Sequence, residues 1–219
     1  MMERNVLLFL GLYIIFNSEC WCGASEAESS SKTTETVTPY PGCGVRQNDN
    51  IQFLTSTNSN SYPWIASVHK FMLDGSEGSM CSAALIHPRF LITAAHCVSS
   101  GTIEDTFVIF GAEPTQKLQN LDFEHFLSNI HIHPKFNKTA SLEFKNSPDV
   151  ALLELEKDVE LGKTLNAICL PTMPTIFSEN LVMEVAGFDH LEHKAQINTV
   201  RVLSNEACIY TNGYDFLKR

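Results

Sequence analysis

The sequence predicts an all-β protein, and two observations support this prediction. Short runs of β-branched and aromatic residues recur about every ten positions, with turn residues between them. No long segment with apolar residues at helical spacing interrupts this pattern. A β-barrel and a β-sandwich both fit. We expect strands over residues 62–68, 81–86, 90–93, 107–110, 127–132, 149–155 and 181–187.

The predicted strands follow from local sequence, taken in chain order. The first predicted strand contains Trp64, Ile65 and Val68. These residues are aromatic or β-branched, and both kinds are enriched in strands. The turn His87-Pro88-Arg89 makes 81–86 and 90–93 a hairpin-like pair. The run 107–110 is apolar throughout, and Asp149 opens a further apolar strand. The remaining runs, 127–132 and 181–187, continue the same spacing of short apolar runs and turn residues.

Composition limits the classes of partner. The chain has 219 residues, of which 44% are hydrophobic and 18% charged, as in ordinary globular proteins. Its formal net charge of −10 opposes binding to a polyanion, because like charges repel. We therefore expect no nucleic-acid partner, and protein partners or protein substrates instead.

The N-terminal segment 1–24 has the pattern of a secretory signal. A short charged start precedes the apolar run Val6–Phe16, and small residues lead to an expected cleavage site after Ala24. The alternative is a membrane anchor, but so short an apolar run does not cross a hydrocarbon core of about 30 Å. The sequence thus predicts a secreted, extracellular protein without a membrane anchor.

Residues 25–50 are predicted to form a flexible segment rich in Ser and Thr. Residues 25–42 carry almost no large apolar side chains, so burial cannot offset the entropy cost of ordering them. A solvated linker is the favoured interpretation, with O-glycosylation as the alternative. Order is expected to begin near Cys43.

Four sequence blocks carry a family resemblance: Cys81–Ile86, Leu91–Val98, Asn146–Leu153 and Ile168–Pro171. Their order and spacing resemble those of the trypsin-like (chymotrypsin-fold) serine proteases, and the resemblance extends from Cys43 to about Cys208. It implies two antiparallel β-barrels with an active site between them. We expect a protease domain over 51–219, with the first barrel complete and the second partial. The strands over 165–170 and 181–185 should then lack partners.

The resemblance implies catalytic roles for two residues. His96 corresponds to the general base, and Asp149 to the carboxylate that orients the imidazole. The plainer alternatives are a histidine on a half-buried turn and a cap at a strand start. No Gly-Asp-Ser-Gly segment follows up to Arg219, so the nucleophilic serine is absent from the sequence. We expect the chain to be catalytically inactive as it stands.

The cysteine count is odd once the signal, with Cys20 and Cys22, is removed. By resemblance, one disulfide joins Cys81 to Cys97 beside the histidine. The same resemblance pairs Cys43 with Cys169, which ties the propeptide-like segment to the body. Cys208 is left unpaired, or links two chains into a dimer.

The activation region differs from that of active family members. Active members are cut after a basic residue, which frees a new N-terminus. By resemblance Ile51 corresponds to that N-terminus, but Asn50 precedes it in place of a basic residue. Arg46 is the nearest basic residue, and the stretch Cys43–Gln47 resembles that of arthropod noncatalytic serine-protease homologues. This resemblance favours an inactive homologue.

Two histidine pairs and one sequon remain. His131 with His133 and His190 with His193 are candidate zinc ligands, but neither pair has thiolate support. We expect no metal and no cofactor. Asn137 begins the sequon Asn137-Lys138-Thr139, which predicts N-glycosylation on a surface loop.

Three functions remain open on the sequence. The first is a noncatalytic serine-protease homologue that acts by binding in an extracellular proteolytic cascade. The second is a fragment or isoform of an active serine endopeptidase. The third is a secreted, disulfide-stapled β module with an unrelated binding role, which the absence of the two expected disulfides would favour.

Overall fold

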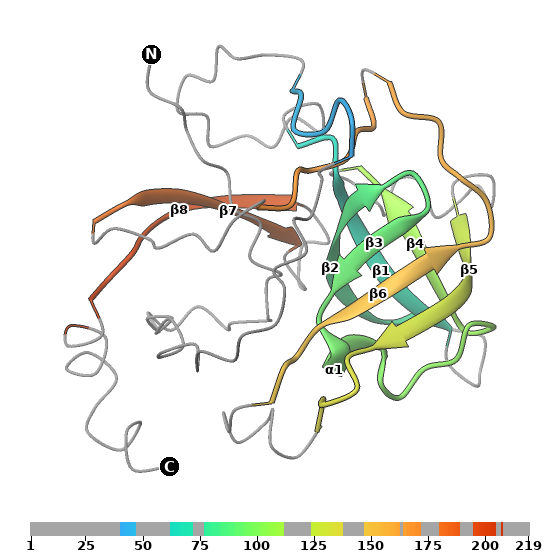
Figure 1. Cartoon of the computed structure of the whole chain (residues 1–219). Helices are drawn as coiled ribbons and strands as arrows, with labels where there is room; N and C mark the ends of the chain where they lie inside the picture. Colours follow the sequence, from blue (N-terminus) through green and yellow to red (C-terminus); the bar gives the residue numbers. More distant parts are fainter. Residues whose placement is uncertain are drawn as a thin grey trace, which may run out of the picture.

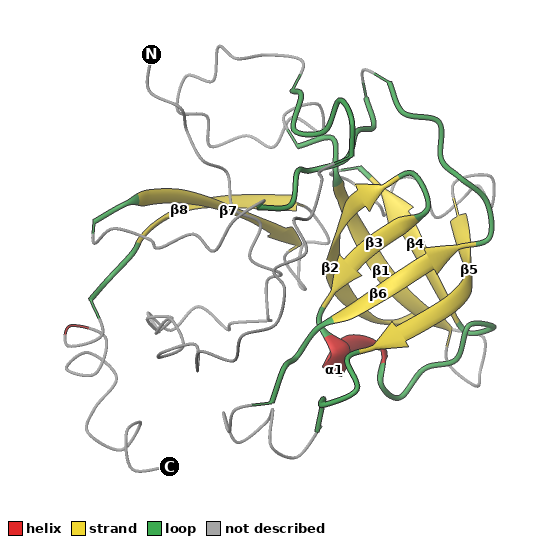
Figure 2. Cartoon of the chain, viewed as in Figure 1, coloured by secondary structure: helices red, strands yellow, loops and turns green. Residues whose placement is uncertain are grey.

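The computed structural model describes residues 40–46, 62–71, 77–111, 124–137, 147–162, 164–171, 180–188, 195–204 and 207. Within these residues the fold consists almost entirely of strands (Figure 2). The predicted segment 1–24 and most of 25–50 lie outside the described residues. The described elements are β1 (Ile65–Phe71), β2 (Glu77–His87), β3 (Phe90–Thr93), α1 (Ala95–Val98), β4 (Thr106–Phe110), β5 (Glu124–Ile132), β6 (Ala151–Leu155), β7 (Val182–Phe188) and β8 (Ala195–Arg201).

Six of these strands close into a barrel, which is the first barrel that the sequence predicted (Figure 1). Its order is β1-β2-β3-β6-β5-β4, and neighbouring strands pair antiparallel. The β2–β3 hairpin around Pro88 is confirmed. Closure removes unpaired strand edges, which would otherwise be sites of aggregation.

The barrel interior is filled by large apolar side chains. In strand β6, buried and partly buried residues alternate, because successive side chains of a strand point to opposite faces. Strand β4 is buried at every position. The largest fully buried apolar side chains are those of Trp64, Phe107, Leu85, Leu91, Ile109, Leu153 and Leu155.

Several strand boundaries differ from the predicted ones. Residues 62–64 form a turn, in which the Ile65 amide donates to the Tyr62 carbonyl, and Pro63 has no N–H to offer a ladder. Strand β6 begins at Ala151, so Asp149 precedes the strand instead of opening it. Strand β8 was not predicted.

The second sheet is the partial second barrel, and it contains β7 and β8. These strands pair along their whole length, from Val182 opposite Arg201 to Phe188 opposite Ala195. Strand β7 also joins the first barrel, because the Phe188 amide donates to Ser82 Oγ at 2.9 Å. No helix among the described residues is long and apolar enough to cross a membrane.

The expectation that 165–170 and 181–185 lack partners is therefore wrong. Residues 182–185 pair with β8. In the other segment, the Asn166 amide donates to the Pro63 carbonyl and the Ile168 amide to the Leu85 carbonyl. Ile168 is 6% exposed. The segment 165–170 packs against the first barrel. The barrel supplies both the apolar surface that covers this segment and the acceptors of its hydrogen bonds.

Candidate active site

His96 is presented by the short helix α1, which directly follows β3. Thr93, the last residue of β3, donates its hydroxyl to the Ser82 carbonyl at 2.9 Å, which fixes the strand end. Ala95 and Val98 bury their side chains in the barrel. The side chain of His96, in contrast, is 22% exposed.

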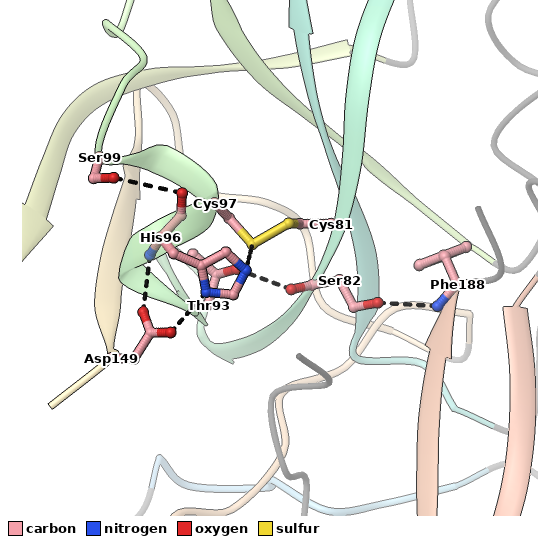
Figure 3. Close-up of a disulfide and its surroundings, with 8 residues drawn as sticks. All are labelled: Cys81, Ser82, Thr93, His96, Cys97, Ser99, Asp149 and Phe188. Carbon is pink, nitrogen blue, oxygen red and sulfur yellow. Dashed lines mark hydrogen bonds and ion pairs between the residues drawn. A yellow bond between two sulfur atoms is a disulfide. The ribbon is translucent and has the colours of Figure 1, made fainter. Parts of the chain in front are cut away.

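Asp149 lies in the segment that leads into β6, and strand pairing brings it to His96. Thr93 pairs with Ala151, so the end of β3 and the start of β6 are adjacent. Oδ2 of Asp149 lies 2.6 Å from His96 Nδ1, and Oδ1 accepts the His96 backbone N–H at 2.8 Å (Figure 3). The structure thus brings together the two predicted residues.

The carboxylate decides which imidazole nitrogen carries the proton in the neutral ring. An ionised carboxylate only accepts hydrogen bonds, so Nδ1 is the donor and Nε2 keeps its lone pair. This is the tautomer that a general base requires, because Nε2 can then take a proton from a substrate or nucleophile.

A sulfur atom lies close to His96 Nε2. Cys97 Sγ lies 3.5 Å from His96 Nε2, and it is bonded to Cys81 Sγ. In the part of the chain that the structure describes, no hydroxyl lies within hydrogen-bonding distance of Nε2. Sequence reasoning placed the disulfide beside His96 but did not anticipate this contact.

The cluster Cys81, His96 and Cys97 has ligand-like spacing, since one ligand atom from each lies within 4.8 Å of the others. Zinc binding requires deprotonated thiolates. Both sulfurs are instead shared in the Cys81–Cys97 disulfide, whose Cα atoms are 6.2 Å apart. With the disulfide formed, the cluster fixes α1 to β2 and does not offer a metal site.

The second expected disulfide, Cys43–Cys169, is also present, with its Cα atoms 5.0 Å apart. It holds the segment 40–46 against the connection that follows the first barrel. Cys208 lies outside the described residues, so its pairing stays a prediction.

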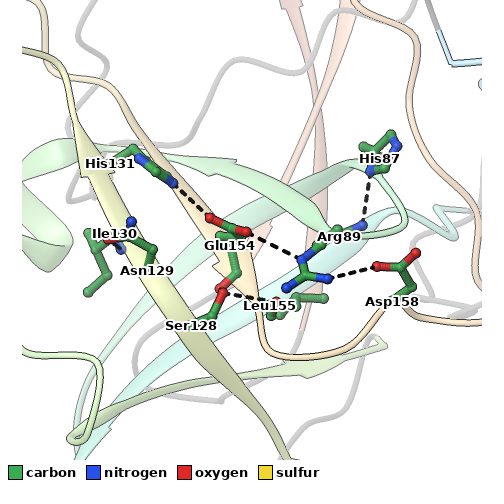
Figure 4. Close-up of polar contacts among 9 residues, drawn as sticks. All are labelled: His87, Arg89, Ser128, Asn129, Ile130, His131, Glu154, Leu155 and Asp158. Carbon is green, nitrogen blue, oxygen red and sulfur yellow. Dashed lines mark hydrogen bonds and ion pairs between the residues drawn. The ribbon is translucent and has the colours of Figure 1, made fainter.

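In the first histidine pair, the two side chains make separate contacts. His131 Nε2 lies 3.0 Å from Glu154 Oε2 (Figure 4), whereas His133 Nδ1 accepts the Lys135 amide. His190 and His193 lie outside the described residues. Asn137 is exposed beyond the end of β5, and the rest of its sequon is not described.

One polar cluster escaped the sequence reasoning. Arg46 and Tyr62 both contact the carboxylate of Glu184, which lies on β7. Burial, and then the hydrogen bond to Glu184, raises the pKa of the Tyr62 phenol to about 12. No local pattern could have identified this cluster, because Arg46 and Glu184 are 138 positions apart.

Known proteins resemble this chain in sequence and in fold. It is 30% identical over 208 residues to "Phenoloxidase-activating factor 3" of Holotrichia diomphalia. That match covers 89% of this chain and 56% of that protein. It is 26% identical over 175 residues to "Venom serine protease 34" of Apis mellifera, covering 76% of this chain and 42% of that protein. The chain spans about half the length of these relatives.

A solved structure described as "Structure of GrC" has the same fold, with a TM-score of 0.58 and 19% sequence identity. The match covers 72% of this chain and 67% of that one. The family model described as Trypsin matches residues 51–216. The disulfides and this match remove the grounds for an unrelated β module. The chain belongs to the trypsin family of serine proteases.

Proposed function

We propose that this protein is a secreted serine-protease homologue that acts by binding other proteins in an extracellular proteolytic cascade, without hydrolysing peptide bonds. The contact of His96 Nε2 with Cys97 Sγ carries this proposal. A general base must lie within hydrogen-bonding reach of the hydroxyl that it activates. Within the described residues, Nε2 faces a disulfide sulfur that has no proton to give.

Two features support secretion. The Cys43–Cys169 and Cys81–Cys97 disulfides are of a kind that persists in oxidising compartments and is rare in the cytosol. The N-terminal pattern of residues 1–24 is that of a cleaved secretory signal. The exposed position of Asn137 is compatible with an N-linked glycan.

The names of the relatives support a role in a cascade. One relative is called an activating factor, so its name attributes to it an effect on another protein. We propose that this chain binds an extracellular trypsin-like protease or its zymogen and changes how fast that partner is processed. The partner is a protein, since the net charge of −10 opposes nucleic acid.

A second candidate function is that the chain forms part of an active serine endopeptidase. The His96–Asp149 geometry favours it, because the pair has the hydrogen bonds of a competent base and its orienting carboxylate. A Gly-Asp-Ser-Gly segment encoded downstream in the transcript would support this candidate.

Sequencing the 3′ end of the transcript separates the two candidates, and an assay of the purified 219-residue protein tests whether the chain itself hydrolyses substrates. We expect no turnover of peptide or ester substrates and no labelling by organophosphorylating serine reagents. The His96→Ala variant is the control for contaminating proteases. Turnover that survives affinity purification and disappears in His96→Ala would reject the proposal and favour the endopeptidase.

Binding is tested separately, with purified trypsin-like zymogens as probes. We expect a zymogen to bind the protein, and its activation rate to change when the protein is added. Because the proposed role does not use general-base chemistry, His96→Ala should have the same effect as the wild type. Loss of the effect in His96→Ala would contradict a purely binding role.

A further inference from the structure

The side chain of Arg46 is enclosed by residues from two other parts of the chain. Its Nη1 and Nη2 atoms each lie 3.4 Å from Glu184 Oε2 on β7. Its guanidinium carbon lies 4.4 Å from the centroid of the Tyr62 ring and 5.4 Å from that of Trp64. Only 11% of the side chain is exposed. We call Arg46, Tyr62, Trp64 and Glu184 the Arg46 cluster.

The cluster is held together by one carboxylate oxygen. Glu184 Oε2 accepts the Tyr62 hydroxyl at 2.9 Å in addition to its contacts with the guanidinium. Tyr62 and Trp64 meet edge to face, with ring centroids 6.1 Å apart. The faces of aromatic rings attract cations, so both rings favour the position of the guanidinium. Removing Arg46 from this place breaks several contacts at once.

The backbone around Arg46 is fixed as well. The Gly44 amide donates to the Ala167 carbonyl at 2.7 Å. Asn166 Nδ2 donates to the carbonyls of Gly42 and Val45 at 3.2 and 3.3 Å. The Cys43–Cys169 disulfide anchors the same segment covalently. Residues 42–46 are therefore attached to the body through main chain, side chains and sulfur (Figure 1, segment in blue).

We propose that the Arg46 cluster couples the segment 40–46 to β7 and protects the peptide bond after Arg46 from trypsin-like proteases. Such proteases insert the arginine side chain into a deep specificity pocket with an acidic floor. Arg46 can enter that pocket only after it leaves Glu184 and both rings. Cleavage then requires a locally opened state, and its rate follows the population of that state.

This inference concerns regulation and goes beyond the proposed binding function. Arg46 is the nearest basic residue ahead of Ile51, so the bond after it is the nearest one ahead of that position that fits trypsin-like specificity. The enclosed side chain then slows processing of the folded protein at this bond. Whether the His96–Asp149 pair supports hydrolysis does not affect the inference, because the cluster lies outside that pair.

The test is limited digestion of the full chain by trypsin, with fragments identified by mass spectrometry. Samples are reduced before measurement, because the Cys43–Cys169 disulfide would keep cut fragments together. Lys135 and Lys157 are exposed and serve as reference sites. In the wild type, we expect cleavage after Arg46 to be at least about tenfold slower than after the reference sites.

Glu184→Gln removes the negative charge but keeps an oxygen that accepts the Tyr62 hydroxyl. We expect cleavage after Arg46 to rise about three- to thirty-fold, the range expected for loss of a partly exposed charge-assisted contact. Cleavage after Lys135 and Lys157 should stay unchanged. Arg46→Lys is a second variant that trypsin still recognises, and it should be cut faster because lysine lacks the planar fork.

Glu154→Gln is the matched control. Glu154 lies 3.3 Å from Arg89 Nε on the barrel (Figure 4), and its side chain is 24% exposed, against 23% for Glu184. This variant also removes a carboxylate from an arginine, but the ion pairs of Glu154 join it to Arg89 and His131 and not to the Arg46 cluster. We expect no change in cleavage after Arg46.

Three outcomes would overturn the proposal. The first is wild-type cleavage after Arg46 as fast as after Lys135. The second is unchanged cleavage after residue 46 in both Glu184→Gln and Arg46→Lys. The third is an equal rise at every site in both variants, because the cluster would then support the whole fold instead of protecting one bond.

Discussion

Asp149 holds His96 at two points. Its Oδ1 atom accepts the His96 backbone N–H at 2.8 Å, and its Oδ2 atom lies 2.6 Å from Nδ1 of the same residue. One carboxylate therefore fixes both the main chain of α1 and the orientation of the imidazole. Because its side chain is only 12% exposed, water competes little for these hydrogen bonds.

Asp149→Asn should reverse the imidazole tautomer. The amide oxygen can still accept the His96 backbone N–H, but the amide nitrogen then faces Nδ1 and donates to it. The ring proton should move to Nε2, which nitrogen chemical shifts of labelled His96 would detect. Asp149→Ala should instead destabilise the protein by about 1–3 kcal/mol, since it removes both acceptors. An unchanged tautomer in Asp149→Asn would show that the carboxylate does not set the proton position.

Alanine substitutions at three glycines distinguish the cost of backbone strain from the cost of steric crowding. Gly44 has a φ of +74°, and a Cβ there would lie 3.1 Å from Cys169 Sγ. Gly42 has a φ of +80° but nothing within 4 Å, and Gly162 has neither constraint. Substitution by Ala should cost more than about 1 kcal/mol at Gly44, about 1 kcal/mol at Gly42, and nothing at Gly162.

Urea denaturation of the three variants measures these differences. The expected order of destabilisation is Gly44→Ala, then Gly42→Ala, then Gly162→Ala. Equal losses at Gly42 and Gly44 would mean that the contact with the Cys43–Cys169 disulfide adds nothing to the backbone strain.

The pKa of Tyr62 predicts a pH dependence of stability. The folded-state pKa of about 12 exceeds the ordinary value of 10.0, so the folded protein holds this proton more tightly than the unfolded chain does. The stabilisation is complete below about pH 10 and is lost as the pH rises towards about 12. Urea denaturation between pH 8 and pH 12, compared with Tyr62→Phe, should show a steeper loss in the wild type. Parallel curves would contradict the prediction.

The state of Cys208 is a prediction about covalent assembly. With the Cys43–Cys169 and Cys81–Cys97 disulfides formed, no partner from these four residues is left for it. We expect a free thiol or a dimer linked through Cys208, which non-reduced peptide mapping would identify. The Cys208→Ser variant should run as a monomer on non-reducing gels. A bridge from Cys208 to Cys97 or Cys169 would contradict both assigned disulfides.

Local sequence patterns determined most of the strands, and the family resemblance supplied the two residues of the candidate site. Turn residues and β-branched runs act over a few positions, so the β2–β3 hairpin and the buried β4 strand could be predicted. The blocks around His96 and Asp149 identified the pair by family resemblance. Strand β8 was missed because its run is short and weakly apolar, and its residues do not alternate regularly in burial.

Tertiary structure alone decided which distant groups meet. The sequence does not state that β3 pairs with β6, yet this register places Asp149 beside His96, 53 positions away. The same holds for Arg46 and Glu184, which meet only because β7 packs beside the first barrel. Periodicity encodes which face of a strand is apolar, whereas contacts between strands depend on closure and register, which the whole chain determines by burying its core.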